Sequence, residues 1–162
     1  MKTAVFVDGS NLYVELRRRR LLPVDMTALA WTLVGGRPAS MRLYTAPFAR
    51  SHETFTHTLQ KKGWLVVEGR ATPKGEKGVD VGLAVDLVLA AADGLYDRAI
   101  LVSGDGDLAR AVEAARELGL EVVVAQFQDA IAQDLARAAS EVRLLEALPW
   151  PSLRYAKEAV WT

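Results

Sequence analysis

Short apolar segments rich in β-branched residues, separated by stretches of helical character, constrain the fold of this chain most. These segments are largely continuous apolar runs and lack the polar alternation of a half-exposed strand. They occupy residues 3–8, 64–67, 98–103 and 120–125. Strands that are apolar toward both sides are typical of a parallel sheet covered by helices on both faces. The sequence therefore predicts an α/β fold, a three-layer α/β/α sandwich with a mainly parallel sheet.

Helices are expected between these strands. Leu12 and Leu16 lie at helical spacing within residues 11–19, and Asp25 is expected to cap a helix that ends near Leu33. Residues 79–92 are apolar on nearly every face, which is typical of a buried helix. The remaining expected elements are strands over 40–46 and, at an edge, 141–145, helices over 51–63, 107–118 and 129–139, and a loop over 68–78.

Length favours a single domain, since 162 residues can bury one hydrophobic core. We expect this domain over residues 1–148 and an irregular tail over 149–162. The tail carries Trp150, Tyr155 and Trp161, which could cover the core or form a dimer contact.

Composition excludes several classes of protein. The chain has no Cys, so it has no disulfide framework or thiolate chemistry, and His52 and His57 lack partners for a zinc site. No apolar run approaches the roughly 18 residues of a membrane span. Asp8 interrupts the first apolar segment, which argues against a signal peptide. A soluble, cytoplasmic domain without membrane contact is expected.

Charge is distributed unevenly although Lys+Arg and Asp+Glu both number 20. Residues 1–78 carry 13 basic and 6 acidic side chains, 13 − 6 = +7, and residues 79–162 carry 7 and 14, 7 − 14 = −7. Such asymmetry indicates a polyanionic partner such as a nucleic acid, or chance sorting of surface charges.

Acidic side chains gather at one end of the expected sheet. Asp8 ends the first strand, Asp105 and Asp107 follow the strand at 98–103, and Asp80 begins the helix that precedes that strand. All four positions belong to the carboxyl edge of a parallel sheet, where ligands bind. The four carboxylates therefore converge if the first strand and the strand at 98–103 are neighbours.

Convergence of these carboxylates requires a favourable interaction that offsets their mutual repulsion. Two carboxylates about 5 Å apart repel each other by about 3 kcal/mol at an effective dielectric constant near 20, and a helix N-terminus offsets only about 0.3–1 kcal/mol. Either some of the carboxylates are protonated or a divalent cation lies among them. Oxygen ligands favour Mg²⁺ or Mn²⁺, which suits metal-assisted hydrolysis of a phosphodiester. Single Asp residues at such positions are also common as helix caps and turn formers.

Three segments together resemble the NYN domain, a branch of the PIN-like nuclease superfamily. They are VFVDGSNLY (5–13), KGVDVGLAVDLV (77–88) and AILVSGDGDLARAVEAARELGLEVVV (99–124), and the resemblance extends over about residues 3–145. It implies a PIN-like α/β/α fold and metal-dependent endoribonuclease activity. We expect the substrate to be single-stranded RNA. The resemblance further implies that the metal is held by Asp8, Asp80, Asp105 and Asp107, with Asn11 and Ser103 supporting them.

Asn11, Ser103 and Lys77 form the expected substrate-binding group. Lys77 precedes Asp80 by three residues and could bind a phosphate, or could be a solvated loop lysine. Asp86 lies about 9 Å below Asp80 on the same helix, at 1.5 Å per residue. It could be a half-buried carboxylate with a hydrogen-bond partner or a deeper member of the metal site.

Arg17 to Arg20 end the first expected helix, and we expect this end to point away from the carboxyl edge. The run could be a solvated helix end whose charge is matched to the helix dipole, a second contact with RNA or an oligomer contact.

The alternative to a nuclease is a non-catalytic regulatory module that binds RNA or protein and retains the acidic pocket. A homo-oligomer remains open.

Overall fold

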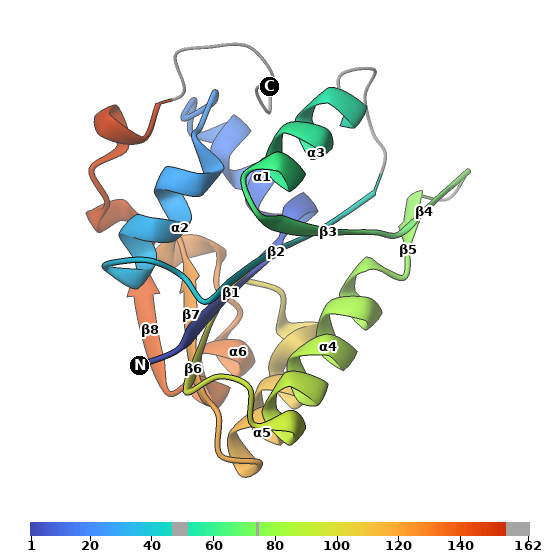
Figure 1. Cartoon of the computed structure of the whole chain (residues 1–162), viewed down its shortest axis with the longest axis vertical. Helices are drawn as coiled ribbons and strands as arrows, with labels where there is room; N and C mark the ends of the chain where they lie inside the picture. The colour runs from blue at the N-terminus through green and yellow to red at the C-terminus, as the bar shows by residue number, and fades with distance from the viewer. Residues whose placement is uncertain (47–51, 74, 155–162) are drawn as a thin grey trace.

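The computed structural model describes residues 1–46, 52–73 and 75–154. Its centre is a six-stranded sheet in the order β3-β2-β1-β6-β7-β8, in which every pairing is parallel (Figure 1). This confirms the α/β class and the parallel sheet expected from the sequence. The strands are β1 (Thr3–Asp8), β2 (Ser40–Thr45), β3 (Trp64–Glu68), β6 (Arg98–Val102), β7 (Glu121–Gln126) and β8 (Glu141–Leu144).

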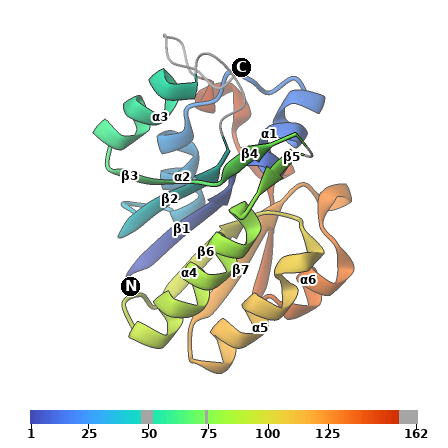
Figure 2. The same cartoon turned by 90° about the vertical axis from the view of Figure 1, so that its right-hand side faces the viewer.

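Helices cover both faces of the sheet, which gives the three layers. Figures 1 and 2 show α1, α2 and α3 on one side of the sheet and α4, α5 and α6 on the other. Asp25 caps α2 as expected, because its Oδ1 accepts a hydrogen bond from the Ala28 amide at 3.0 Å. The helices are α1 (Gly9–Arg18), α2 (Met26–Val34), α3 (His52–Lys61), α4 (Val79–Asp93), α5 (Ala109–Glu117) and α6 (Gln133–Ala138).

The apolar strands supply two cores, one on each face of the sheet. Along β1, Val5 and Val7 belong to the core under α1, α2 and α3, whereas Ala4 and Phe6 belong to the core under α4, α5 and α6. Successive side chains of a strand point to opposite faces, so a strand buried on both faces must be apolar throughout. This accounts for the uninterrupted apolar runs of the sequence.

Two local expectations were wrong. Residues 68–78 are not a plain loop, because β4 (Arg70–Thr72) and β5 (Gly75–Lys77) form an antiparallel hairpin that projects from the sheet (Figure 1). These strands form a two-stranded sheet separate from the central one, and no apolar alternation marks them in the sequence, so the sequence carried no strand signal here. The expected helix over 129–139 is divided into a short 3₁₀ turn, Gln128–Ala130, and α6.

The expectation of a fully buried α4 was also wrong. Leu83 and Leu87 face the core and are fully buried, but Val81, Val85 and Leu89 are exposed. Asp86 lies beside them in the sequence, yet its side chain is turned toward β2 and away from that outer face. The helix therefore presents a second apolar face that nothing in the described part of the chain covers.

The beginning of the tail lies against the core. The Trp150 indole donates a hydrogen bond from Nε1 to the Leu145 carbonyl at 2.8 Å and stacks on Phe127, and Leu153 is buried. Trp150 thus has the core-covering role, while Tyr155 and Trp161 lie outside the described residues. None of the helices in the described ranges has the length and apolar character needed to span a membrane.

Candidate metal centre

The centre of the sheet brings two strand ends together. β1 pairs with β6 in the register Val7 to Val102, so Asp8 and Ser103, the next residues, lie side by side at the carboxyl edge. The chain order reverses between these two strands, since β2 lies on one side of β1 and β6 on the other. Such a switch point leaves a crevice where open α/β sheets bind their ligands.

Asp8 has a structural partner for each carboxylate oxygen. Its Oδ1 accepts a hydrogen bond from the backbone amide of Asn11 at 3.4 Å, and this contact caps α1. Its Oδ2 accepts a hydrogen bond from the Ser103 hydroxyl at 2.8 Å. Ser103 is fully buried, and its Oγ also accepts a hydrogen bond from the Asp105 amide at 3.1 Å. The Ser103 hydroxyl thereby links Asp8 to the turn that carries Asp105.

The turn after β6 places two further carboxylates. Oδ1 of Asp105 accepts a hydrogen bond from the Asp107 amide at 2.9 Å, which caps the 3₁₀ turn Gly106–Leu108. Across from this turn, α4 begins after Gly78, whose φ of 84° is accessible to glycine at little cost, and Asp80 lies in its first turn. The N-terminus of α4 and the β6 turn thus face each other.

Three carboxylates converge at this point. One oxygen each from Asp80, Asp105 and Asp107 lies within 4.8 Å of the other two, and the first and last of these residues are exposed while Asp105 is half-buried. Three oxygens at such spacing, open to solvent on one side, match the preference of Mg²⁺ and Mn²⁺ for carboxylates completed by water. The residues present therefore fit a hard divalent cation.

Asp8 lies behind these three carboxylates and is not one of the group that converges most closely. Burial raises the pKa of Asp8 from 3.8 to about 6, the charges of Asp80 and Asp105 act in the same direction, and the hydrogen bonds from Ser103 and Asn11 oppose the increase. A buried carboxylate that is this costly to ionise is typical of functional sites. A cation bound in front of Asp8 would favour its ionised form.

Asn11 holds two other segments in place. Its Oδ1 accepts hydrogen bonds from the Gly104 amide at 2.9 Å and from Nε2 of Gln126 at 2.7 Å. Gln126 is fully buried at the end of β7, and the sequence reasoning missed it. Its signal was a polar side chain that ends an otherwise apolar strand at the same edge of the sheet, as Asp8 does.

Gly104 is required by a close approach of two loops. A Cβ built on Gly104 would lie 1.7 Å from the Ala130 carbonyl oxygen, so no larger residue fits unless the backbone moves. The Ala132 amide also donates a hydrogen bond to the Gly104 carbonyl at 3.0 Å. The segment after β7 therefore locks the turn that carries Asp105 and Asp107.

Asp86 lies apart from the converging carboxylates. Its Oδ2 accepts a hydrogen bond from the Tyr44 hydroxyl at 2.8 Å. Burial and this hydrogen bond raise the pKa of Tyr44 above its usual range. This contact agrees with the interpretation of Asp86 as a half-buried carboxylate with a hydrogen-bond partner. The same hydrogen bond links α4 to β2.

We expect Asp86→Asn to leave any metal-dependent activity within about twofold of wild type and to lower the free energy of unfolding by about 1 kcal/mol. Asparagine keeps a carbonyl oxygen for the Tyr44 hydroxyl but loses the charge that a cation would need. Chemical denaturation and an activity assay on the same sample check this. A loss of activity as large as that of Asp105→Asn would place Asp86 in the metal site.

The basic candidates fall on two segments. The expectation that the Arg17–Arg20 run points away from the carboxyl edge was wrong, because Arg18 and Arg19 form ion pairs with Asp129, three residues beyond the end of β7. The last turn of α1 therefore lies near this edge. The side chain of Lys77 lies outside the described residues, although its backbone ends β5 just before α4.

Comparison with known proteins agrees with this architecture. The family model of the NYN domain matches residues 2–146. The crystal structure of a protein of unknown function from Vibrio parahaemolyticus RIMD 2210633 is similar, with a TM-score of 0.74 and 27% sequence identity over 89% of this chain and 92% of that one. No curated protein matches. With its parallel sheet, nuclease-like fold and carboxylates at the switch point, the chain belongs to the NYN domain family.

Proposed function

We propose that this protein is a Mg²⁺- or Mn²⁺-dependent endoribonuclease that hydrolyses phosphodiester bonds of single-stranded RNA. The convergence of Asp80, Asp105 and Asp107 within 4.8 Å at the switch point of a nuclease-like fold carries this proposal. Further support comes from the excess positive charge of residues 1–78 and from the location of Arg18 and Arg19 near the carboxyl edge.

Asp80, Asp105 and Asp107 would hold the ion, and Asp8 would complete the site from behind. A bound divalent ion supplies Lewis-acid polarisation of a phosphate and lowers the pKa of a water molecule. Ser103 orients Asp8 and the Asp105 amide; because it is fully buried, we assign it this role instead of a substrate contact. Asn11 holds the turn at Gly104. Lys77, which ends β5 two residues before α4 begins, would contact the phosphate.

We expect an unstructured RNA to be shortened in the presence of Mn²⁺ and to stay intact with a chelator, because the carboxylates alone repel a phosphate. A DNA oligonucleotide of the same sequence, assayed in parallel, tests the preference for RNA. Gel analysis of end-labelled RNA distinguishes internal cuts from trimming at an end. RNA binding without cleavage in Mg²⁺ and in Mn²⁺ would instead support the non-catalytic binding module.

A further inference from the structure

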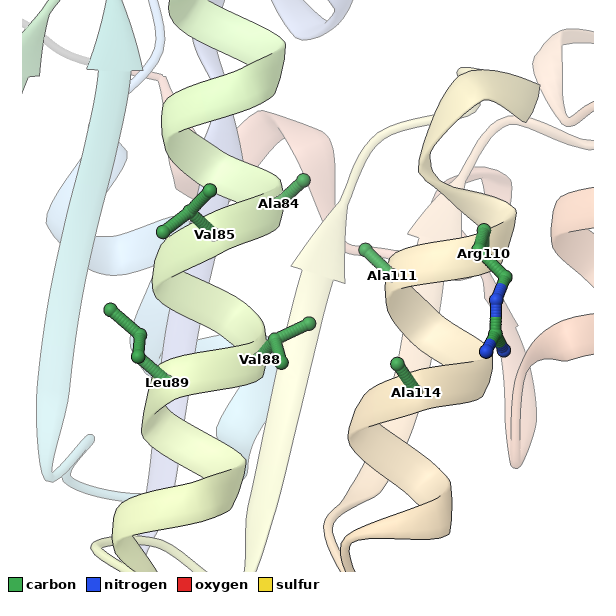
Figure 3. A pocket seen from close by; sticks show the side chains of 7 residues that line it. All are labelled: Ala84, Val85, Val88, Leu89, Arg110, Ala111 and Ala114. Atoms are coloured by element: carbon green, nitrogen blue, oxygen red, sulfur yellow. The ribbon is translucent and has the colours of Figure 1, made fainter.

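An apolar groove lies between α4 and α5, on the outer surface of the molecule. Its volume is about 360 Å³, and Figure 3 shows Ala84 and Val88 pointing from α4 toward α5, with Ala111 and Ala114 pointing back from α5. The alanines leave room between the helices. Arg110 is the charged side chain that lines this groove.

The apolar surface continues beyond the groove along α4. Val81, Val85 and Leu89 expose 68%, 49% and 53% of their surface and follow one another at intervals of four residues, on a single helical face. Contiguous apolar surface of this kind marks interaction sites on soluble proteins. A helix that is apolar on nearly every side is usually buried on every side. In α4, the described part of the chain covers only the inner face.

Charges on α5 are arranged for pairing with a copy of the same helix. Arg110 lies near its N-terminus and Glu117 near its C-terminus, two turns later, and Glu113 lies between them on the same helical face. Both side chains are about 70% exposed, and within the chain Arg110 reaches Glu113 at 3.3 Å and Glu117 at 3.5 Å. An antiparallel second α5 would place Arg110 beside the other copy's Glu117, and the reverse, which makes two identical ion pairs.

We propose that this face binds a second copy of the chain, through a two-fold axis that crosses α4 and α5 and sets each helix antiparallel to its counterpart. Val85 and Leu89 of each copy would then meet Leu89 and Val85 of the other. Such an isologous contact needs a surface complementary to itself, which the apolar stripe and the opposite charges at the two ends of α5 provide. RNA does not fit, because the face offers a phosphate backbone little positive charge.

This arrangement leaves the carboxylates free. Asp80 and Asp107 lie at the N-terminal ends of α4 and of the segment leading into α5, and an antiparallel arrangement sends those ends in opposite directions. The dimer would present two independent metal centres at its two ends. Dimer formation therefore does not depend on the proposed ribonuclease activity.

The first test compares the same substitution at two exposed helical valines. Val85→Asp places a charge in the proposed contact, whereas Val14→Asp places one on α1, on the opposite side of the sheet, where Val14 is 59% exposed. We expect wild type and Val14→Asp to be dimers at micromolar concentration, and the dissociation constant of Val85→Asp to rise at least about 100-fold. Analytical ultracentrifugation measures this, and circular dichroism establishes that each variant is folded.

A second test uses charge reversal and does not disturb apolar packing. Arg110→Glu and Glu117→Arg each replace two attractions by two repulsions, so each variant alone should dimerise about tenfold more weakly at low salt. An equimolar mixture of the two variants should recover the affinity, because the two acidic side chains of one variant would then face the two basic side chains of the other. A wild-type monomer at high micromolar concentration, or a mixture no tighter than its components, would overturn the proposal.

Discussion

Asp105→Asn is expected to lower metal-dependent RNA cleavage by about 1,000-fold while leaving the fold intact. Asp105 is the half-buried member of the three converging carboxylates, and it is also linked through its backbone amide to Ser103 and so to Asp8. Asparagine retains the carbonyl oxygen that accepts the Asp107 amide, so the 3₁₀ turn keeps its cap. The substitution removes a charge from the cation site and little else, and losses of this size are typical when a preorganised electrostatic contact is removed.

The comparison needs an aspartate of the same chemistry outside the site. Asp134 lies in the first turn of α6, is largely exposed and lies 3.6 Å from Arg137, so Asp134→Asn should cleave RNA at the wild-type rate. Asp80→Asn should lose activity as Asp105→Asn does, since it removes a second carboxylate of the group. Full activity in both Asp80→Asn and Asp105→Asn would show that cleavage does not need a cation held by these carboxylates. Equal losses of activity in all three variants would indicate a general defect in folding.

The parallel direction of the strands was predictable from the sequence because burial on both faces of a sheet leaves a distinct pattern. An apolar run as short and as rich in valine as that of β7 is typical of a strand buried on both faces of a parallel sheet. The placement of Asp8, Asp80, Asp105 and Asp107 at one edge follows from the same pattern, since each residue stands where a strand ends or a helix begins. The adjacency of β1 and β6, which the sequence left as a condition, places Asp8 beside Ser103 and the turn that carries Asp105. Of the four expected carboxylates, however, only Asp80, Asp105 and Asp107 form the closely spaced group, and Asp8 lies behind it.

The features that the sequence did not predict depend on contacts between distant segments. Gln126 reaches Asn11 across 115 positions, and no local pattern reports such a hydrogen bond. The location of the last turn of α1 likewise depends on the pairing of Arg18 and Arg19 with Asp129, more than 100 positions away. The outer face of α4 is a different case: the sequence indicates correctly that it is apolar, and the described part of the single chain leaves it uncovered.

Asp8→Asn is expected to stabilise the metal-free protein at neutral pH, by up to about 3 kcal/mol, although it removes a carboxylate from the proposed site. The pKa of Asp8 is raised from 3.8 to about 6, chiefly because the side chain is buried. Each pKa unit corresponds to about 1.4 kcal/mol, so ionising this carboxyl in the folded state costs about 3 kcal/mol. Asparagine keeps an acceptor for the Asn11 amide and carries no charge to desolvate.

The sign of the pH dependence follows from proton binding. Between about pH 4 and pH 6 the folded state holds a proton on Asp8 that the unfolded state has already released, so the free energy of unfolding falls as the pH rises. This loss is complete above about pH 6 and absent below about pH 4. The Asp8→Asn variant lacks this contribution, so its stability should match that of wild type near pH 4 and exceed it at about pH 7.

Urea denaturation at several pH values in the presence of a chelator measures the difference, and Asp134→Asn serves again as the matched control, with the pH profile of wild type. Adding Mn²⁺ at neutral pH should reduce the difference in stability between the variant and wild type, because the variant retains Asp80, Asp105 and Asp107 but binds the cation more weakly without the Asp8 charge. A cation that binds only the folded state stabilises it by about 2.7 kcal/mol at a hundredfold excess over its dissociation constant. Were the variant no more stable than wild type at neutral pH without metal, Asp8 would not be carrying the cost of an ionised, buried carboxylate. Its place behind Asp80 and Asp105 would then be that of a helix cap alone.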